Sequence, residues 1–212
     1  MIVEKQAAPE SGIIFNPWEG PNYKSAVPRL LIVGESHYDW EGRSQPLSMV
    51  TISVVEHWME KPSQFFTNIV ATCIGHLPDT KERKEFWQSV AFYNYIQEFA
   101  GNSPRIRPLQ SLWPASKAAF FEVISSLMPE LVLILGDQNW ENIDHSVGTE
   151  GEPLKSLEGR HSQTWIYPTG EDSHALAFHV KHPSAGYNFK TFFPLFSEAR
   201  ERVINPPRPS TS

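Results

Sequence analysis

Residues 29–39 of the chain read Arg-Leu-Leu-Ile-Val-Gly-Glu-Ser-His-Tyr-Asp. The continuous apolar run ends at Gly34 and polar residues follow it, a pattern typical of a strand that is buried on both faces and leads into a loop. Residues 90–96 and 131–135 contain similar runs, and the second of these ends at Gly136. Residues 163–167 and 175–180 are weaker strand candidates. The chain therefore predicts several short, buried strands.

Helical patterns lie between and after these strands. Apolar residues recur on one helical face over residues 116–127 and again over residues 188–203, where Asn188 is a plausible N-cap and Pro194 predicts a break or kink. Residues 48–75 predict one or two helices around Pro62. Alternation of strands and helices predicts an α/β fold, in which a parallel sheet carries helices on both faces.

Length and composition limit the class of protein. The 212 residues, 40% of them apolar, fit one folded domain, which we expect over residues 1–205 with a disordered Pro-rich tail over residues 206–212. No apolar run reaches the roughly 18 residues of a membrane span, and no signal-peptide core follows Met1. The single cysteine, Cys73, excludes an intrachain disulfide and any four-cysteine site. We therefore expect a cytoplasmic protein.

The loops that follow the strands carry the residues of chemical interest, because ligands of such sheets bind at the carboxyl ends of the strands. Ser36 follows the first strand, but Tyr38 stands where the nucleophile elbow Gly-x-Ser-x-Gly needs glycine. A Gly-Asp-Ser type esterase with His182 as base would need Asp near position 179, which is His. A serine esterase is thus a minor alternative.

A metal site has little support in the spacing of the histidines. His179 and His182 lie three residues apart at a strand end, where side chains at this spacing point to opposite faces. No His-Glu-x-x-His motif and no Cys/His pair is present. We expect His179 to be a core residue and expect no metal or other cofactor.

Two other positions favour ligand binding. Pro183 stiffens the turn behind His182, so this imidazole can donate a hydrogen bond to a developing anion, and the Ser184 hydroxyl suits a phosphate. A helix cap is the alternative for Pro183-Ser184. Asn94 lies in an apolar strand, where its carboxamide offers a donor and an acceptor to an amide or a nucleobase edge, or instead holds a neighbouring loop.

Five segments in this order resemble the motifs of one known family. They are Gly34-Glu-Ser-His-Tyr38, Phe92-Tyr-Asn94-Tyr-Ile96, the stretch from Gly101-Asn102 to Arg107-Pro108, the stretch from Pro129 to Gly136, and His182-Pro183-Ser184. Together they resemble the uracil-DNA glycosylase superfamily, whose first motif is written G-Q-D-P-Y or G-E-A-P-G and whose second is H-P-S. The resemblance covers the chain from about Arg29 to Lys190 and implies a three-layer α/β/α sandwich around a central, mostly parallel, four-stranded sheet.

The resemblance implies a monomeric enzyme of base excision repair that flips uracil or a related deaminated base out of DNA and hydrolyses its N-glycosidic bond. His182 would stabilise the departing base, Asn94 would recognise its edge, and Tyr38 would crowd the methyl group of thymine. Other residues of the implied site are then of two kinds. Gly34, His37 and Trp40 would line the base site, with Phe66 a second candidate for stacking. Lys181, Ser184, Tyr187, Lys190 and Arg107 would contact DNA, and Tyr187 or Ala185 would act as a wedge.

The first motif departs from the family pattern in ways that leave alternatives open. Ser36 occupies the position of the water-activating Asp, and a serine cannot act as a general base near neutral pH without a partner. Glu35, Asp39 or His37 could take this role. The G-E-A-P-G branch usually holds an iron–sulfur cluster on four cysteines, which this chain lacks. A catalytically silent nucleic-acid-binding relative therefore remains an alternative.

The charges are distributed unevenly. The net charge is −6, which by itself argues against DNA binding. However, residues 99–121 and 173–197 contain no Asp or Glu, whereas residues 137–158 contain six acids and one Lys. The acid-free segments hold Arg107, Lys181 and Lys190, so a positive groove can form locally despite the net charge.

Overall fold

The fold is described from a computed structural model of the chain, which describes residues 12–103, 106–155, 161–184 and 186–206. Of the expected tail over residues 206–212, residues 207–212 lie outside the described residues, as does Ala185, one of the two expected wedge residues. Within the described ranges no helix combines the length and apolar character needed to cross a membrane. The strands are β1 (Trp18–Glu19), β2 (Leu30–Gly34), β3 (Ala91–Asn94), β4 (Leu131–Leu135), β5 (Thr149–Lys155), β6 (His161–Pro168) and β7 (His174–Val180).

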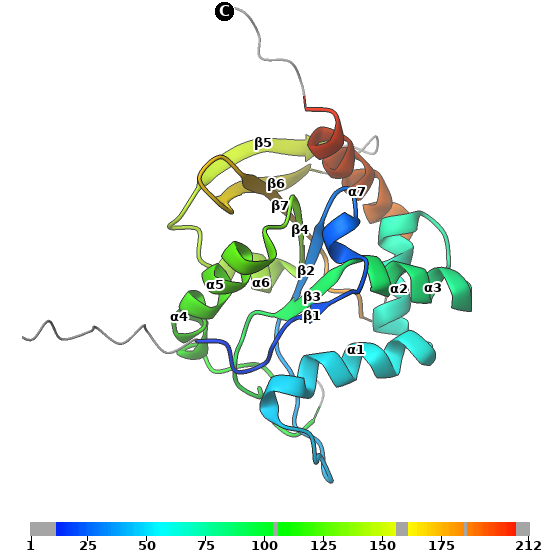
Figure 1. The fold of residues 1–212 in the computed structure, drawn as a ribbon, viewed down its shortest axis with the longest axis vertical. Helices are drawn as coiled ribbons and strands as arrows, with labels where there is room; N and C mark the ends of the chain where they lie inside the picture. Colours follow the sequence, from blue (N-terminus) through cyan, green and yellow to red (C-terminus); the bar gives the residue numbers. More distant parts are fainter. Residues whose placement is uncertain (1–11, 104–105, 156–160, 185, 207–212) are drawn as a thin grey trace, which may run out of the picture.

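The helices alternate with these strands along most of the chain (Figure 1). Their bounds are η1 (Tyr23–Ser25), η2 (Leu47–Met49), α1 (Val50–Glu60), α2 (Gln64–Ile74), α3 (Thr80–Ser89), α4 (Leu112–Ala115), α5 (Lys117–Leu127), α6 (Asp137–Asn142) and α7 (Phe189–Ile204). Two helices around Pro62 are confirmed as α1 and α2. Asn188 caps α7 as expected, since its side chain accepts a hydrogen bond from the Lys190 backbone N–H, but α7 continues through Pro194.

One sheet forms the centre of the molecule, with strand order β1-β3-β2-β4-β7-β6-β5. The strands β3, β2, β4 and β7 are parallel to one another, whereas β1, β6 and β5 pair antiparallel. The α/β class is confirmed, but the expected four-stranded sheet is too small. Strands β1 and β5 were missed because β1 has two residues and β5 is mostly exposed, so neither carries a strong apolar pattern.

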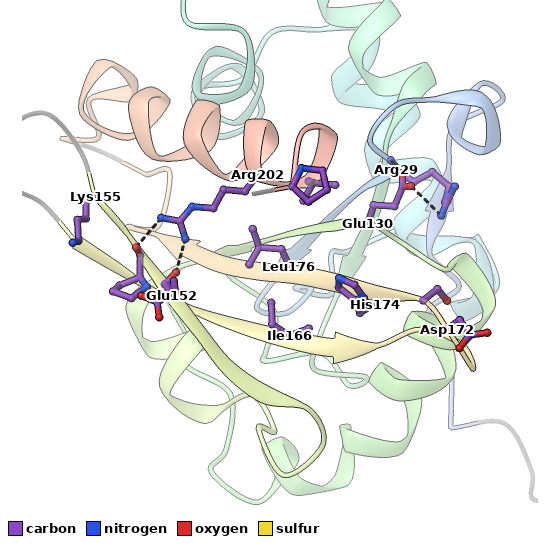
Figure 2. A pocket seen from close by; sticks show the side chains of 13 residues that line it. Arg29, Glu130, Glu152, Lys155, Ile166, Asp172, His174, Leu176 and Arg202 are labelled. Atoms are coloured by element: carbon purple, nitrogen blue, oxygen red, sulfur yellow. Dashed lines mark hydrogen bonds and ion pairs between the residues drawn. The ribbon is translucent and has the colours of Figure 1, made fainter. Parts of the chain in front are cut away.

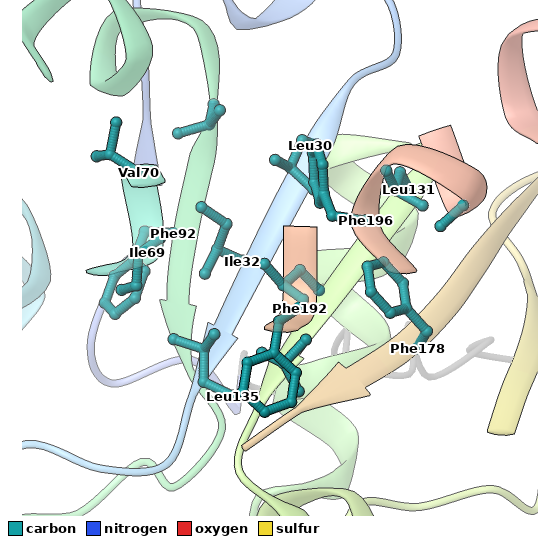
Figure 3. Close-up of a cluster of buried hydrophobic side chains, with 14 of the residues drawn as sticks. Leu30, Ile32, Ile69, Val70, Phe92, Leu131, Leu135, Phe178, Phe192 and Phe196 are labelled. Carbon is teal, nitrogen blue, oxygen red and sulfur yellow. The ribbon is translucent and has the colours of Figure 1, made fainter. Parts of the chain in front are cut away.

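Helices pack on both faces of the sheet because its central strands alternate their side chains between two cores. In β2, Leu30 and Ile32 face the core formed with α1, α2, α3 and α7, whereas Leu31 and Val33 face the core formed with α5 and α6. Figure 3 shows the first core, in which Phe192 and Phe196 of α7 lie over the sheet beside Phe178 of β7. These two cores hold the carboxyl ends of the parallel strands in fixed positions.

The pairing of β2 with β3 continues beyond the sheet into the two loops that follow. The carbonyls of Gly34, Glu35 and His37 accept hydrogen bonds of 3.0, 2.9 and 2.9 Å from backbone N–H groups of the other loop. The Asp39 N–H then donates to the Gly101 carbonyl at 2.8 Å. The first-motif loop therefore runs beside the segment after Asn94.

Gly34 and Asn94 are paired in register at the ends of these strands. A Cβ atom on Gly34 would lie 2.1 Å from Asn94 Oδ1 and 3.2 Å from the Phe92 ring. No side chain can occupy position 34 unless the carboxamide moves. Glycine is thus required by this close approach rather than by a turn.

Substitution of Gly34 tests this contact. Gly34→Ala should lower the free energy of unfolding by about 1–3 kcal/mol, the usual cost of adding a methyl group where no space is available. The same substitution should cost less in an Asn94→Ala background, because the obstructing oxygen is gone. Urea unfolding of the wild type, both single variants and the double variant measures the coupling, and equal costs in the two backgrounds would contradict the contact.

Candidate functional site

A cavity of about 280 Å³ opens at the carboxyl ends of β2 and β3, beside the loop that follows β7. Most of the residues expected to bind or convert a substrate lie around it. Its lining is Glu35, Ser36, His37, Tyr38, Trp40, Val54, Trp58, Phe65, Phe66, Phe92, Asn94 and His182. Gly34 lies directly beneath the Asn94 carboxamide. The rule that strand ends carry the ligand site therefore located this pocket.

His182 is held by its own loop and by α2. The Asn68 side chain, buried on α2, donates a hydrogen bond of 3.2 Å to the Pro183 carbonyl. The Ser184 N–H donates to the His182 carbonyl at 2.7 Å, which tightens the turn. The Phe65 ring lies 5.2 Å from the imidazole, centre to centre. The imidazole is thus fixed at the pocket wall.

Burial lowers the pKa of His182 from 6.5, and the positive charge of Arg107 lowers it further. The imidazole is consequently neutral at neutral pH. A neutral imidazole still has one N–H donor, so His182 can donate a hydrogen bond into the pocket without carrying a charge.

Glu35 forms an ion pair with Arg107 at the mouth of the pocket. The Arg107 Nη1 atom lies 3.0 Å from Glu35 Oε2 and 3.4 Å from Oε1. The Glu35 side chain is 10% exposed, whereas that of Arg107 is 64% exposed. Burial raises the pKa of Glu35, and the charge and hydrogen bond of Arg107 oppose this rise. Both residues were expected in the site, but their pairing across 72 positions was not.

Asn94 and Ser36 present polar atoms that the protein leaves unused. Asn94 is 6% exposed, and none of the described residues forms a hydrogen bond with its side-chain carboxamide, although its backbone carbonyl accepts one from Gln97 at 2.8 Å. Ser36 Oγ is buried and has no hydrogen-bond partner among the described residues. A buried polar group without a partner is costly, so Ser36 Oγ is suited to a ligand. The Asn94 carboxamide lines the pocket that such a ligand would enter.

Aromatic rings form the rest of the wall. Phe66 and Trp58 stack with ring centres 6.1 Å apart and planes 25° apart, and Trp40 stands at the mouth with 40% of its surface exposed. Trp40 and Phe66 were expected as stacking candidates. Trp58 and Phe65 were missed because aromatic residues at helical spacing predict core packing as readily as a ligand wall.

Several expected site residues lie outside the pocket. Asp39 binds Arg43 at 2.7 Å, and this hydrogen bond holds the pKa of Asp39 below its usual value. The Tyr187 hydroxyl lies 2.8 Å from Thr72 Oγ1, and its ring stacks on Phe192, so it anchors the loop to α2 and α7. The remaining expected DNA contacts, Lys181, Ser184 and Lys190, are exposed around this loop.

His179, which was expected to be a core residue, points away from the pocket. It stacks on Trp140 with ring centres 4.9 Å apart, and its Nδ1 lies 3.3 Å from Asp137 Oδ1. The described part of the chain contains no cluster of three or more His, Cys, Asp or Glu side chains that could hold a metal ion.

A larger cleft of about 800 Å³ lies at the opposite ends of the parallel strands, between α7 and strands β5 to β7 (Figure 2). Its two arginines bind a carboxylate or backbone carbonyls. Arg29 lies 3.6 Å from Glu130, and Arg202 donates to the carbonyls of Glu152 and Pro153 at 2.6 and 2.9 Å. None of the expected site residues lines this cleft, so the smaller pocket is the candidate site.

His37 forms part of the pocket floor and is almost fully buried. It is 5% exposed, its Nε2 lies 2.9 Å from Thr51 Oγ1, and its ring meets the edge of Phe15. Burial lowers the pKa of His37 from 6.5 to about 4. The folded state therefore favours the neutral imidazole. The contribution of His37 to the free energy of unfolding is complete above pH 6.5 and is lost as the pH falls toward 4.

This shift makes a prediction about stability. When the pH is lowered from 7 to 5, protonation linked to His37 should decrease the free energy of unfolding by about 2 kcal/mol. The His37→Gln variant should lack this decrease and still provide a polar partner for Thr51. Urea unfolding at the two pH values measures the difference. The exposed His161→Gln serves as a matched control and should keep the pH dependence of the wild type. A His37→Gln variant with that same dependence would contradict the assignment.

Sequence comparison with known families and curated proteins identifies no relative of this chain. The chain matches no protein-family model, and no curated protein shows significant sequence similarity to it. The chemistry of the pocket, in which a neutral histidine, an uncommitted carboxamide and a buried carboxylate face one aromatic-walled space, is therefore the guide to function.

Proposed function

We propose that this chain is a DNA glycosylase that excises uracil or a related deaminated base by flipping it out of the strand and hydrolysing its N-glycosidic bond. One observation supports this proposal above the others. Asn94 and His182, which come from segments far apart in the sequence, both line an aromatic-walled pocket of about 280 Å³. A planar base fits such a pocket, because aromatic side chains stack on its faces while polar groups recognise its edge.

Asn94 accounts for the recognition of the base. Its carboxamide presents a donor and an acceptor side by side, which match O4 and N3–H of uracil. Cytosine carries the reverse pattern, with an amino donor beside an acceptor nitrogen. No described residue forms a hydrogen bond with the carboxamide, so recognition of a base would not have to break one within the described part of the chain.

His182 accounts for the departure of the base. Cleavage of the glycosidic bond leaves negative charge on the uracil, and a donor aimed at an oxygen of the ring stabilises that charge more than it stabilises the ground state. The lowered pKa of His182 keeps this donor neutral. Rigid attachment through Asn68 and Pro183 means that little reorganisation is needed during the reaction.

Glu35 is the best-placed group for the attacking water. Asp39 lies outside the pocket and is bound to Arg43, and His37 donates to or accepts from Thr51. The Glu35 carboxylate lines the pocket, can hold a water and can stabilise positive charge that develops on the sugar. The charge and hydrogen bond of Arg107 favour its ionised form against the effect of burial.

The same ion pair favours a second candidate, a catalytically silent DNA-binding relative. A carboxylate held by a guanidinium is a weaker base, and Ser36 supplies no substitute. The serine esterase has no support in the geometry, because Ser36 Oγ has no hydrogen-bond partner in the described part of the chain and therefore no base.

A glycosylase assay separates the two candidates. Oligonucleotides that carry uracil, hypoxanthine, xanthine or mismatched thymine should release at least one of these bases with the wild-type protein. His182→Ala should reduce that rate by about 10²–10³, the usual effect of removing a donor to a developing anion. His161→Ala, at an exposed position of β6, should leave it unchanged. Salt-sensitive DNA binding without base release from any substrate would indicate the silent relative instead.

The dependence of kcat/KM on pH tests the roles of Glu35 and Arg107. The wild-type rate should fall at acidic pH, as Glu35 is protonated through its raised pKa. Arg107→Ala should move this fall to higher pH, because the guanidinium lowers the pKa of both Glu35 and His182. Arg107→Lys keeps the charge and should shift the profile less.

Glu35→Gln provides the decisive comparison for the same measurement. This variant should lower kcat/KM and remove the part of its decrease at acidic pH that arises from protonation of Glu35. A Glu35→Gln profile with the wild-type rate and shape would exclude this carboxylate from the reaction.

A further inference from the structure

A second cavity adjoins the base pocket. Its volume is about 420 Å³, and Trp40, Val54 and Trp58 line both cavities. Val54 and Trp58 lie one turn apart on α1, so one face of this helix forms the partition. The rest of the lining is polar and consists of Gln45, Ser53 and His57. A ligand that enters the base pocket therefore has a second space immediately beside it.

Two features of this second cavity suit a nucleobase. Trp40 is 40% exposed and offers its ring at the junction of the two cavities, and nucleobases stack readily on such rings. Gln45 Oε1 is enclosed by the protein but has no hydrogen-bond partner among the described residues. An acceptor in this state is matched by the N–H groups that line the edge of a base.

We propose that the second cavity receives the base next to the target base, so that the preferred substrate is single-stranded DNA. The proposal rests on the proposed function, since it takes the first cavity to hold the target. Trp40 stacks on the neighbouring base, and Gln45 Oε1 accepts a hydrogen bond from its edge. In a duplex the neighbouring base is paired and stacked, and filling both cavities would require two adjacent bases to leave the helix, whereas a single strand offers them at little cost.

Binding can be measured without cleavage. Single-stranded oligonucleotides that carry 2′-fluoro-2′-deoxyuridine resist hydrolysis, because the fluorine disfavours positive charge on the sugar. In one series of strands the residue on the 5′ side of the target is varied, and in a second series the residue on its 3′ side. The varied residue carries adenine, carries unsubstituted purine or is abasic. Fluorescence anisotropy measures the Kd of each strand. On one of the two sides, an abasic residue should weaken binding about tenfold relative to adenine. Purine, which stacks but lacks the amino donor, should lie between them.

Variants assign these differences to residues. Trp40→Ala should remove the penalty of the abasic residue, and Gln45→Leu should remove the difference between adenine and purine while it keeps that penalty. Leu47→Ala is the matched control, because Leu47 begins η2 directly after the loop that holds Trp40 and Gln45, is 42% exposed and lines neither cavity. It should behave as the wild type. The single strand should also bind about tenfold more tightly than its duplex.

The proposal fails if abasic residues on both sides leave Kd unchanged, if Trp40→Ala and Gln45→Leu retain the wild-type differences, or if the duplex binds as tightly as the single strand. Release of base from ordinary deoxyuridine strands is measured separately. Flank-dependent binding without release would support the second cavity and overturn the glycosylase. Release without flank dependence would support the glycosylase and overturn the second cavity.

Discussion

The candidate site depends on the parallel pairing of β2 with β3, which continues for several residues past the sheet. This pairing places Gly34 opposite Asn94 so closely that a Cβ atom would lie 2.1 Å from the carboxamide oxygen. The loop after Gly34 is held beside the segment after Asn94 by backbone hydrogen bonds, the last of them from Asp39 to Gly101. Site residues that follow one strand thereby gain a fixed position relative to those of the other.

The parts of the fold that could be predicted from the sequence are those with strong local patterns. The runs that became β2 and β4 are apolar throughout, because helices cover both of their faces. Strand β5 alternates weakly and is mostly exposed, and it is defined by its pairing with β6 rather than by its own residues. Its place in the sheet is a tertiary property, so the expected sheet was too small.

The candidate site also divides into features that local sequence patterns predicted and features that depend on tertiary structure. That Gly34, Asn94 and His182 would meet followed from their positions at strand ends, since the carboxyl ends of parallel strands share one edge. Interactions between side chains distant in the sequence could not be predicted from strand positions. The Glu35–Arg107 ion pair spans 72 positions, and neither residue has a local signal for the other. Asp39 is a contrasting case, because its place directly after the first motif suggested a catalytic role while Arg43, four positions later, binds it.

If the pocket holds a base as proposed, its electrostatics bear on how a chain of net charge −6 would accommodate a nucleic acid at this place. Burial drives both ionisable groups of the wall toward their neutral forms, raising the pKa of Glu35 and lowering that of His182. A neutral wall suits an uncharged base, but activation of water needs a carboxylate. The guanidinium of Arg107 stands largely in solvent, and its positive charge opposes the rise in the pKa of Glu35 that burial causes. In the proposed function, the same exposed charge would also attract a phosphate backbone toward the pocket.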